Sequence, residues 1–314
     1  MLMLPKISII MSVYKEPIEW VELSINSILE QTYSNIELII ICDNPQDRHL
    51  VCYLLRKKKS DHRVILHINE SNKGLIYSLN KAISLTSGTY IARMDADDIS
   101  LSSRLENQMA FLEKEELDLC GCNALLFSEK GIIGKTNKLE KHKFIEKLMW
   151  YGDIGIIHPT FFGKREVFIK SGGYNKKAIH AEDMEFIAHI LTLGYKVGNL
   201  SKYLLKYRFS ENSITRKNAF SLYTTISCIK KSYRKFKKSE KYFFENKIIN
   251  NPKKEINYTK NKIYLTKSRE AINSKRFLIV IYFLVLAIIK SPILFYHSIK
   301  ILIINKLLKR MESN

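Results

Sequence analysis

Short apolar runs alternate with segments of helical periodicity over the first third of this chain, and this alternation constrains its fold more than any other feature. Four runs are rich in β-branched residues and have the length of buried strands, at Ile7–Val13, Ile36–Cys42, Val64–Ile68 and Thr89–Met94. Apolar residues recur at helical spacing between them, at Val21–Leu29, Leu50–Lys58 and Leu75–Leu85. Strands that alternate with helices in this way form a parallel sheet covered on both faces. The sequence therefore predicts an α/β fold with a mostly parallel central sheet.

Polar side chains directly after the predicted strands are the candidates for a functional site, because open sheets of this kind bind ligands at the carboxyl ends of their strands. Such residues follow each of the four strands, at Ser12–Glu16, Asp43–Asn44, Asn69–Gly74 and Asp95–Asp98. None of these segments is a GxGxxG or a GxxxxGKS/T loop, so neither a dinucleotide site nor a P-loop is predicted.

Three aspartates, Asp95, Asp97 and Asp98, lie within four residues after the fourth strand. Their charges repel one another unless a cation neutralises them. A hard divalent ion, Mg²⁺ or Mn²⁺, held by one or two carboxylates and by diphosphate oxygens, is the natural partner at a strand end. The alternative is that Asp97 or Asp98 caps a helix that begins near Ser102 while the other carboxylates are solvated.

A second acidic pair, Glu182 and Asp183, opens a helical stretch from Met184 to Leu193. A carboxylate in this position can act as a general base toward a hydroxyl group. The alternative is that both acids only stabilise the N-terminus of the helix. Taken with the three aspartates, the pair favours a catalytic site that uses a divalent metal.

The positive charge of the chain is confined to its last third. The net charge is +20, yet residues up to Ser201 contain 25 basic and 25 acidic side chains, against 26 and 6 from Lys202 onward. Such segregation indicates a neutral globular domain with a tail that contacts a polyanion. Tyr and Phe interleave the basic residues, but no RNA- or DNA-binding motif is present, so no nucleic-acid partner is expected.

An apolar segment follows the basic region and favours an anionic membrane surface as the partner. Residues 277–289 are uninterrupted apolar, Pro292 follows, and residues 293–304 are again mostly apolar. Thirteen residues span about 20 Å as a helix, short of the ~30 Å hydrocarbon core. We therefore expect two helices broken at Pro292 that lie on the membrane, with Lys and Arg side chains reaching the headgroups. The alternative is that these helices pack on the catalytic domain as ordinary core.

The cysteines and the start of the chain indicate a cytoplasmic protein. Five cysteines form an odd set without a CxxC pair, and the first residues lack a secretory apolar region. For Cys120 and Cys122 we expect buried strand thiols rather than zinc ligands, because no second Cys or His pair has a suitable spacing.

The chain resembles the bacterial family-2 inverting glycosyltransferases, which have a GT-A domain and build lipooligosaccharide, capsule and O-antigen chains. The resemblance covers Ile7 to Arg208 and depends on an ordered set of motifs. These are Ile9–Tyr14, Gln31–Tyr33 with Glu37–Ile41, Asn72–Leu75 with Ser78–Ala82, Gly88–Asp98, His158-Pro159, Gly172–Tyr174, Ala181–Asp183 and Tyr207-Arg208. It implies a GT-A catalytic domain over residues 1–209. The charge and apolar patterns of the rest of the chain predict a basic helical linker over 210–276 and membrane-associating helices over 277–314.

The resemblance also implies roles for individual residues. The nucleotide-sugar side would contain Val13, Tyr14, Asp43, Asn72, Lys73, Arg93 and Asp95. Val13 and Tyr14 would line the nucleobase pocket, Asp43 would accept a hydrogen bond from a uracil-type base near Asn72, and Lys73 or Arg93 would supply positive charge. Asp95 and Asp97 would hold the metal, Asp95 also facing the ribose.

On the acceptor side, the resemblance implies that Asp183 is the catalytic base, with Glu182 and His158 nearby. Family members often have a His where this chain has Ser210. The family mark of processive synthases, QxxRW, is absent, so transfer of one sugar per encounter is expected.

The function predicted from the sequence is metal-dependent, inverting transfer of a hexose or N-acetylhexosamine. The donor would be a nucleotide sugar, UDP-linked, and the acceptor a hydroxyl of a cell-surface glycan or a lipid-linked glycan. The enzyme would lie at the inner face of the cytoplasmic membrane as a peripheral, monotopic protein. Two alternatives remain at this stage: a sugar-phosphate nucleotidyltransferase, and a catalytically inactive membrane-associated scaffold.

Overall fold

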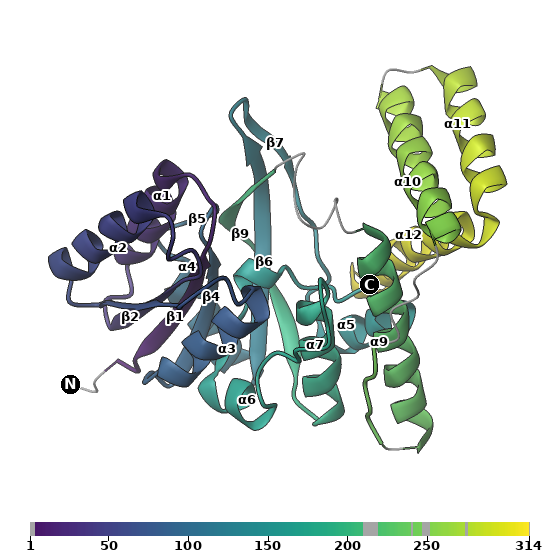
Figure 1. The fold of residues 1–314 in the computed structure, drawn as a ribbon. Coiled ribbons are helices and arrows are strands. Elements are labelled where there is room, and N and C mark those ends of the chain that lie inside the picture. Colours follow the sequence, from purple (N-terminus) through teal and green to yellow (C-terminus); the bar gives the residue numbers. More distant parts are fainter. Residues whose placement is uncertain (1–3, 210–218, 240, 247–251, 274–275, 314) are drawn as a thin grey trace.

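The computed structural model describes residues 4–209, 219–239, 241–246, 252–273 and 276–313. Its centre is one mixed sheet with the strand order β3-β2-β1-β4-β8-β6-β9-β5, and β7 pairs with β6 (Figure 1). The strands are β1 Ile7–Val13, β2 Ile36–Cys42, β3 Val64–Ile68, β4 Tyr90–Asp95, β5 Ile99–Ser100, β6 Leu119–Ser128, β7 Gly131–Lys135, β8 Phe162–Lys164 and β9 Val197–Arg208. The helices of the first two thirds are α1 Ile18–Leu29, α2 Arg48–Ser60, α3 Leu75–Leu85, α4 Arg104–Lys114, α5 His142–Tyr151, α6 Arg165–Lys170 and α7 Glu182–Thr192.

One half of the sheet is parallel and the other half is mixed. Strands β3, β2, β1 and β4 run parallel, with Ile7 opposite Ile36 and Ser12 opposite Asp95. Beyond β4 the direction changes, because β8 is antiparallel to both β4 and β6, while β6 and β9 are parallel. The predicted α/β class is confirmed, and the polar ends of the parallel strands meet at one edge.

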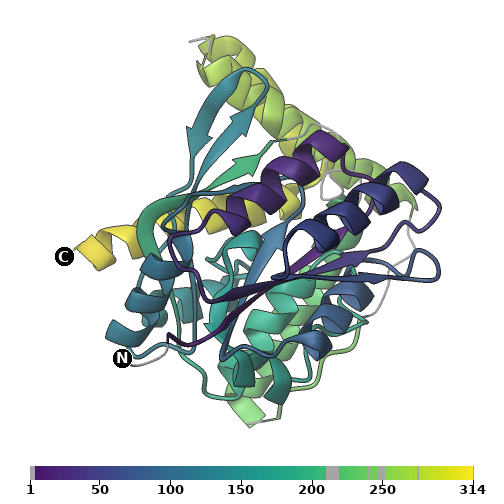
Figure 2. The same cartoon turned by 90° about the vertical axis from the view of Figure 1, so that its left-hand side faces the viewer.

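Helices cover both faces of the sheet, and each face has its own apolar core (Figures 1 and 2). Alternate residues of β1 point to opposite faces, as the two-residue period of a strand requires. Ile9 and Met11 pack with Ile25 of α1 on one face, whereas Ile10 packs with Leu79 of α3 on the other. This arrangement holds the loops after β1, β2 and β4 on a rigid base.

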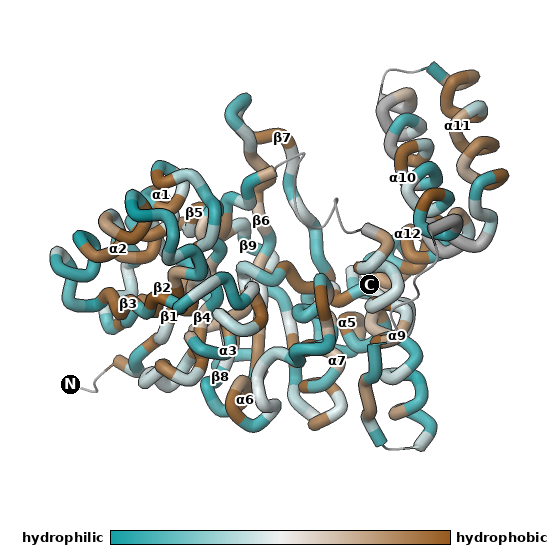
Figure 3. Tube along the Cα trace, in the orientation of Figure 1, coloured by the Kyte–Doolittle hydropathy of each residue, from teal (hydrophilic) through white to brown (hydrophobic). Residues whose placement is uncertain are grey.

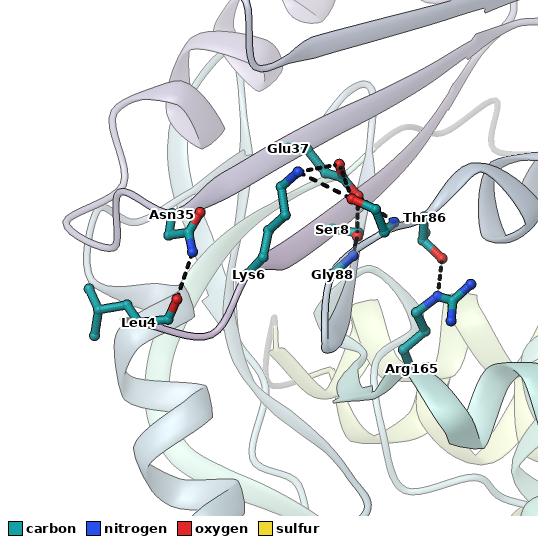
Figure 4. A network of polar contacts seen from close by, with 9 residues as sticks. Leu4, Lys6, Ser8, Asn35, Glu37, Thr86, Gly88 and Arg165 are labelled. Carbon is teal, nitrogen blue, oxygen red and sulfur yellow. Dashed lines mark hydrogen bonds and ion pairs between the residues drawn. The ribbon is translucent and has the colours of Figure 1, made fainter. Parts of the chain in front are cut away.

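A buried carboxylate joins the starts of three sheet segments (Figure 4). Glu37 of β2 accepts hydrogen bonds from the Ser8 hydroxyl at 2.5 Å and the Ser87 backbone N–H at 2.7 Å, and its Oε2 lies 2.9 Å from Lys6 Nζ. The Ser8 hydroxyl accepts in turn from the Gly88 N–H at 2.8 Å. Burial alone would raise the pKa of Glu37, but the hydrogen bonds outweigh burial and lower the pKa to about 2.

The C-terminal helices divide into a packed part and a projecting part. They are α9 Ala219–Ser239, α10 Pro252–Asn273, α11 Phe277–Lys290 and α12 Pro292–Ser313. Ile229 and Tyr233 of α9 are buried in the core that includes α5 and α7. On α12, Asn305 donates to Asp153 at 3.1 Å. Near its end, Glu312 accepts from the backbone N–H groups that precede α5.

Helices α10 and α11 form a hairpin that extends away from the sheet, and α11 is apolar along its length (Figures 1 and 3). The two apolar helices predicted around Pro292 are present, with the break at Ser291. No helix in the part of the chain that the structure describes is long and apolar enough to cross a membrane. Ser210 lies outside the described residues, and the division of the chain at residues 209 and 276 stays a prediction.

Candidate active site

The three aspartates predicted to hold a metal converge at the carboxyl end of β4. Oxygen atoms of Asp95, Asp97 and Asp98 all lie within 4.8 Å of one another, and among the described residues they form the one such group of potential metal ligands. Neither Asp97 nor Asp98 caps a helix, because α4 begins only at Arg104, with Ser103 as its N-cap residue. Helix capping therefore does not explain why these carboxylates lie so close together.

The electrostatics of the group fit a divalent cation. Burial, then the charges of Asp95 and Glu16, raise the pKa of Asp97 to about 7. Burial and the charges of Asp95 and Asp97 raise the pKa of Asp98 as well. Asp98 Oδ2 is buried and has no hydrogen-bond partner among the described residues. Hard carboxylate oxygens with unused lone pairs are the ligands that Mg²⁺ and Mn²⁺ prefer, so the residues present fit the predicted metal.

Two residues of this site have roles that the sequence did not assign. Arg208, at the end of β9, donates from its backbone N–H to Asp98 Oδ1 at 2.7 Å and from Nε to the Asp97 carbonyl at 2.7 Å. Its guanidinium also lies over the rings of Trp20 and Phe127. Glu16, in the loop after β1, is a fourth acid of the cluster, and burial is the main cause that raises its pKa. In the sequence, its position shortly after the first predicted strand was the signal that could have identified it.

Arg93 of β4 lies near both the metal candidates and the second acidic pair. Its guanidinium is 3% exposed and pairs with Asp95. Within the described residues, its Nε and Nη1 have no hydrogen-bond acceptor. The charge of Arg93 acts on Asp98 and on Asp183 alike, so both acidic groups lie within electrostatic reach of one guanidinium. Buried donors without acceptors are costly, and an anionic ligand between the two acidic groups would satisfy them.

The second acidic pair lies where α7 begins, as predicted. Burial, then the charge of Asp183, raises the pKa of Glu182 to about 7, and burial raises the pKa of Asp183. His158 Nε2 and the Tyr174 hydroxyl are joined by a hydrogen bond of 2.9 Å. His158 Nδ1 lies 3.8 Å from Glu182 Oε1. Burial and then Arg93 lower the pKa of His158, so its ring is neutral and does not form an ion pair with Glu182.

Asp183, unlike Glu182, lines a pocket of about 240 Å³. The other lining residues come from the loop after α5, from the turn before α7, from α9 and from α12: Gly152, Asp153, Ile154, His180, Ala181, Met184, Leu222, Ile226 and Ile301. Asp183 Oδ1 accepts from the Met184 N–H at 2.7 Å. The pocket thus places one carboxylate of raised pKa against a space large enough for a ligand.

Asp43 organises the loop between β3 and α3. Its Oδ1 accepts from Asn69 Nδ2 at 2.7 Å and from the Lys73 N–H at 2.8 Å, and its Oδ2 accepts from the Gly74 N–H at 2.8 Å. Gly74 has a φ of +86°, which L side chains rarely adopt, so the loop shape depends on glycine here. Asn72 accepts from the same N–H at 3.0 Å. A carboxylate accepts about four hydrogen bonds, so Asp43 keeps room for one more.

The structure places the remaining nucleotide-side candidates next to this loop or apart from it. The side chain of Val13 is fully buried in the apolar core, and its carbonyl accepts from the Asp43 N–H at 2.8 Å. Tyr14 donates its N–H to Glu16 at 2.7 Å and is half-buried. The side chain of Lys73 is exposed. The nucleobase contacts implied for Val13, Tyr14, Asp43 and Asn72 stay predictions.

Cys120 and Cys122 are buried, free thiols on β6, as expected for core residues. Burial raises the pKa of both thiols. They are therefore unsuited to zinc ligation, which needs thiolates.

The fold is similar to that of solved structures in complex with UDP-GlcNAc or UDP. The structure resembles that of residues 1–349 of S. aureus TarS in complex with UDP-GlcNAc, with a TM-score of 0.60 and 14% identity, over 91% of this chain and 92% of that one. A second crystal structure, the same TarS segment with UDP, has a TM-score of 0.58. At this level of identity the likeness shows the fold, which is of the GT-A glycosyltransferase type.

Curated relatives match over most of their own length. The O-antigen biosynthesis glycosyltransferase WbnJ of Escherichia coli is 35% identical over 237 residues, 75% of this chain and 90% of WbnJ. WfgD of Escherichia coli, named a UDP-Glc:alpha-D-GlcNAc-diphosphoundecaprenol beta-1,3-glucosyltransferase, is 30% identical over 67% of this chain and 79% of its own. The model of the family described as glycosyl transferase family 2 matches residues 8–172, which include the β4 aspartates. The chain therefore belongs to glycosyltransferase family 2 and is a glycosyltransferase.

Proposed function

We propose that this enzyme transfers one hexose or N-acetylhexosamine from a UDP-sugar, with inversion, to a hydroxyl of a lipid-linked or cell-surface glycan, and that it requires a divalent metal. The observation that supports it is that one buried guanidinium, that of Arg93, pairs with Asp95 and lies within electrostatic reach of Asp183. The relatives support the substrate class, because WbnJ is named for O-antigen biosynthesis and WfgD for a UDP-glucose donor.

On this proposal the diphosphate of the donor lies beside the Arg93–Asp95 ion pair. Asp95 and Asp97 would hold Mn²⁺ or Mg²⁺, which would offset the charge that develops on the leaving diphosphate. The free Nε and Nη1 groups of Arg93 donate to the same anion. The UDP base lies near the loop that Asp43 organises, which places Asn72 and Lys73 beside the nucleoside.

Asp183 is the general base in this proposal, and Glu182 is not. Asp183 lines the pocket beside α7, whereas Glu182 is 9% exposed and lies next to His158. Burial raises the pKa of Asp183, which makes its carboxylate a stronger base toward a sugar hydroxyl. Asp183 takes the proton of the acceptor hydroxyl as the hydroxyl oxygen attacks the anomeric carbon from the face opposite UDP.

The test of the donor and the metal measures UDP release without an acceptor. UDP-glucose and UDP-GlcNAc are incubated with the full chain in Mn²⁺ or in EDTA, and Asp97→Ala is compared with Glu30→Gln, which replaces an exposed acid directly after α1. The proposal expects Mn²⁺-dependent UDP release from one of these donors, lost in Asp97→Ala and kept in Glu30→Gln. Equal release in EDTA, or by Asp97→Ala, contradicts the metal assignment.

We also propose that the α10–α11 hairpin attaches the enzyme to the cytoplasmic face of the membrane. Side chains of α11 that are more than half exposed are all apolar or aromatic: Phe277, Leu278, Ile281, Tyr282 and Ile289. Exposed basic residues, Lys260, Lys267 and Arg276, lie on or beside the hairpin. A contiguous exposed apolar surface with a basic rim is typical of a membrane contact. Nucleic acid is not expected as a partner.

A flotation experiment with phosphatidylglycerol vesicles tests this attachment. Truncation at Phe209 is unsuitable, because it would remove Ile229 and Tyr233 from the core. The full chain with Leu278→Glu is therefore compared with Leu55→Glu, which places the same charge at an exposed leucine of α2. Loss of vesicle binding in Leu278→Glu alone is expected, and equal binding by both variants contradicts the proposal.

A further inference from the structure

A second pocket adjoins the one that contains Asp183. It measures about 120 Å³ and is lined by residues of α9, of α12 and of the end of α5: Tyr151, Lys230, Arg234, Tyr296, Lys300 and Ile301. Ile301 lines both pockets. A Cβ added to Gly152, which lines the first pocket, would lie 3.3 Å from Lys230 Cδ in the second. The two pockets are thus separated by little more than one glycine and one isoleucine.

Three cations converge in the second pocket. Lys230, Arg234 and Lys300 line it, and none of its lining residues in the described part of the chain is acidic. Burial, then the charges of Arg234 and Lys300, lower the pKa of Lys230, as expected where three cations line one pocket. Convergence of like charges in a partly enclosed site is unfavourable unless an anion binds there.

Aromatic rings in and beside this pocket contact two of its cations. The Arg234 guanidinium donates from Nε to the Trp150 carbonyl at 2.8 Å and lies 5.2 Å from the centre of the Trp150 ring. Lys300 Nζ lies 5.9 Å from the Tyr151 ring and 5.6 Å from the Tyr296 ring. These contacts limit the freedom of the two cations, so less entropy is lost when an anion binds.

We propose that this basic pocket binds the phosphate or diphosphate of the acceptor, while the sugar joined to that phosphate lies in the adjoining pocket with its hydroxyl at Asp183. This inference rests on the proposed function of Asp183. It specifies the acceptor as a short glycosyl phosphate, because the neighbouring pockets leave no room for a long glycan between the phosphate and the reacting hydroxyl. It also gives α12 a role, since this helix carries Lys300 and Ile301 and follows the apolar α11 in the chain.

A bilayer phospholipid could supply the same phosphate chemistry, so the experiment must separate the two sources. Inorganic pyrophosphate is titrated into the full chain by calorimetry at fixed ionic strength, with EDTA and without a donor sugar. Wild type is compared with Lys300→Gln and Lys300→Glu, because Lys300 is exposed and its replacement leaves the core intact. The matched control is Lys306→Gln, which removes one exposed charge from the same helix outside the pocket.

The proposal expects pyrophosphate binding by wild type and Lys306→Gln, at least about tenfold weaker binding by Lys300→Gln, and weaker binding still by Lys300→Glu. In the second arm, flotation with phosphatidylglycerol vesicles should decrease equally in Lys300→Gln and Lys306→Gln. No pyrophosphate binding by wild type, or equal binding by all variants, overturns the proposal. A specific loss of vesicle binding in Lys300→Gln without pyrophosphate binding assigns the pocket to a phospholipid and also overturns it. Neither arm contains a donor sugar, so these outcomes are independent of UDP release. UDP release is the measurement that tests the proposed function, and a failure of one proposal can therefore be told from a failure of the other.

Discussion

Replacing Asp97 should make the metal-free protein more stable at neutral pH, although it removes a proposed metal ligand. The pKa of Asp97 is about 7 in the fold, against the ordinary value of 3.8. Because the pKa of Asp97 is higher in the folded than in the unfolded state, its protonated carboxyl group contributes to the free energy of unfolding. This contribution is fully present below about pH 4 and is lost as the pH rises through about 7. A shift of this size corresponds to about 4 kcal/mol at most, and relaxation of Asp95 and Glu16 reduces it to about 2 to 4 kcal/mol.

The assay is urea unfolding in EDTA at about pH 5 and about pH 8 for wild type, Asp97→Asn and the surface control Glu30→Gln. When the pH is raised from about 5 to about 8, the free energy of unfolding of wild type and of Glu30→Gln should fall. That of Asp97→Asn should fall less, by a difference of about 2 kcal/mol or more. Saturating Mn²⁺ at the higher pH should restore stability to wild type and not to Asp97→Asn, because a ligand bound only by the folded state stabilises it. If wild type and Asp97→Asn show the same loss between the two pH values, the fold does not raise the pKa of Asp97, which contradicts the prediction.

Three further changes test the fold around the site. Glu37→Gln should lower the free energy of unfolding at pH 7 by about 2 kcal/mol, with the difference vanishing as the pH falls from about 4.5 to about 2, measured by urea unfolding. Gly173→Ala should destabilise by about 2 to 3 kcal/mol in thermal and urea melts, because φ is +74° and the new Cβ would lie 2.5 Å from Asn80 Oδ1; a change below about 0.5 kcal/mol would contradict this packing. Burial raises the pKa of Glu185 to about 7, so its contribution to stability is lost as the pH rises from about 4.5 through 7, and Glu185→Gln should flatten that part of the stability curve by up to about 3 kcal/mol.

The parallel half of the fold could be predicted from the sequence nearly to the residue. The runs at Ile7–Val13, Ile36–Cys42 and Val64–Ile68 are strands with these bounds, and Leu75–Leu85 is a helix. These strands are continuous apolar runs bounded by polar residues, because helices cover both of their faces. The fourth strand differs by one residue at each end, since Asp95 still pairs with Ser12.

The mixed half and the C-terminal packing could not be predicted, because they depend on contacts between distant residues. Arg208 reaches Asp98 across 110 positions, and no local pattern announces that bond. The raised pKa of Glu16 depends on burial, which only the folded chain reveals. The sequence predicts a basic linker that includes α9 and membrane-associating helices that include α12, yet Ile229, Tyr233 and Leu308 are buried in the core of the catalytic domain. Apolar spacing shows that a helix face will be covered but not by which surface.

The positions of Asp95, Asp97 and Asp183 followed from their places after strands and at a helix start, and the structure brings each of them to such a place. What the sequence could not distinguish was Asp183 from Glu182, which are adjacent and similarly buried. The pocket that Asp183 lines, and that Glu182 does not, separates their proposed roles.

The turnover number of Asp183→Asn, compared with that of Glu182→Gln, tests the central claim most directly. Both are measured with the UDP-sugar that wild type hydrolyses and an acceptor glycosyl phosphate, and UDP binding is measured separately by calorimetry. Loss of a general base predicts that kcat of Asp183→Asn falls by about a hundredfold or more while UDP binds as in wild type, with a smaller decrease for Glu182→Gln. A kcat for Asp183→Asn within about threefold of wild type would contradict the assignment of the base and, with it, the proposed acceptor pocket.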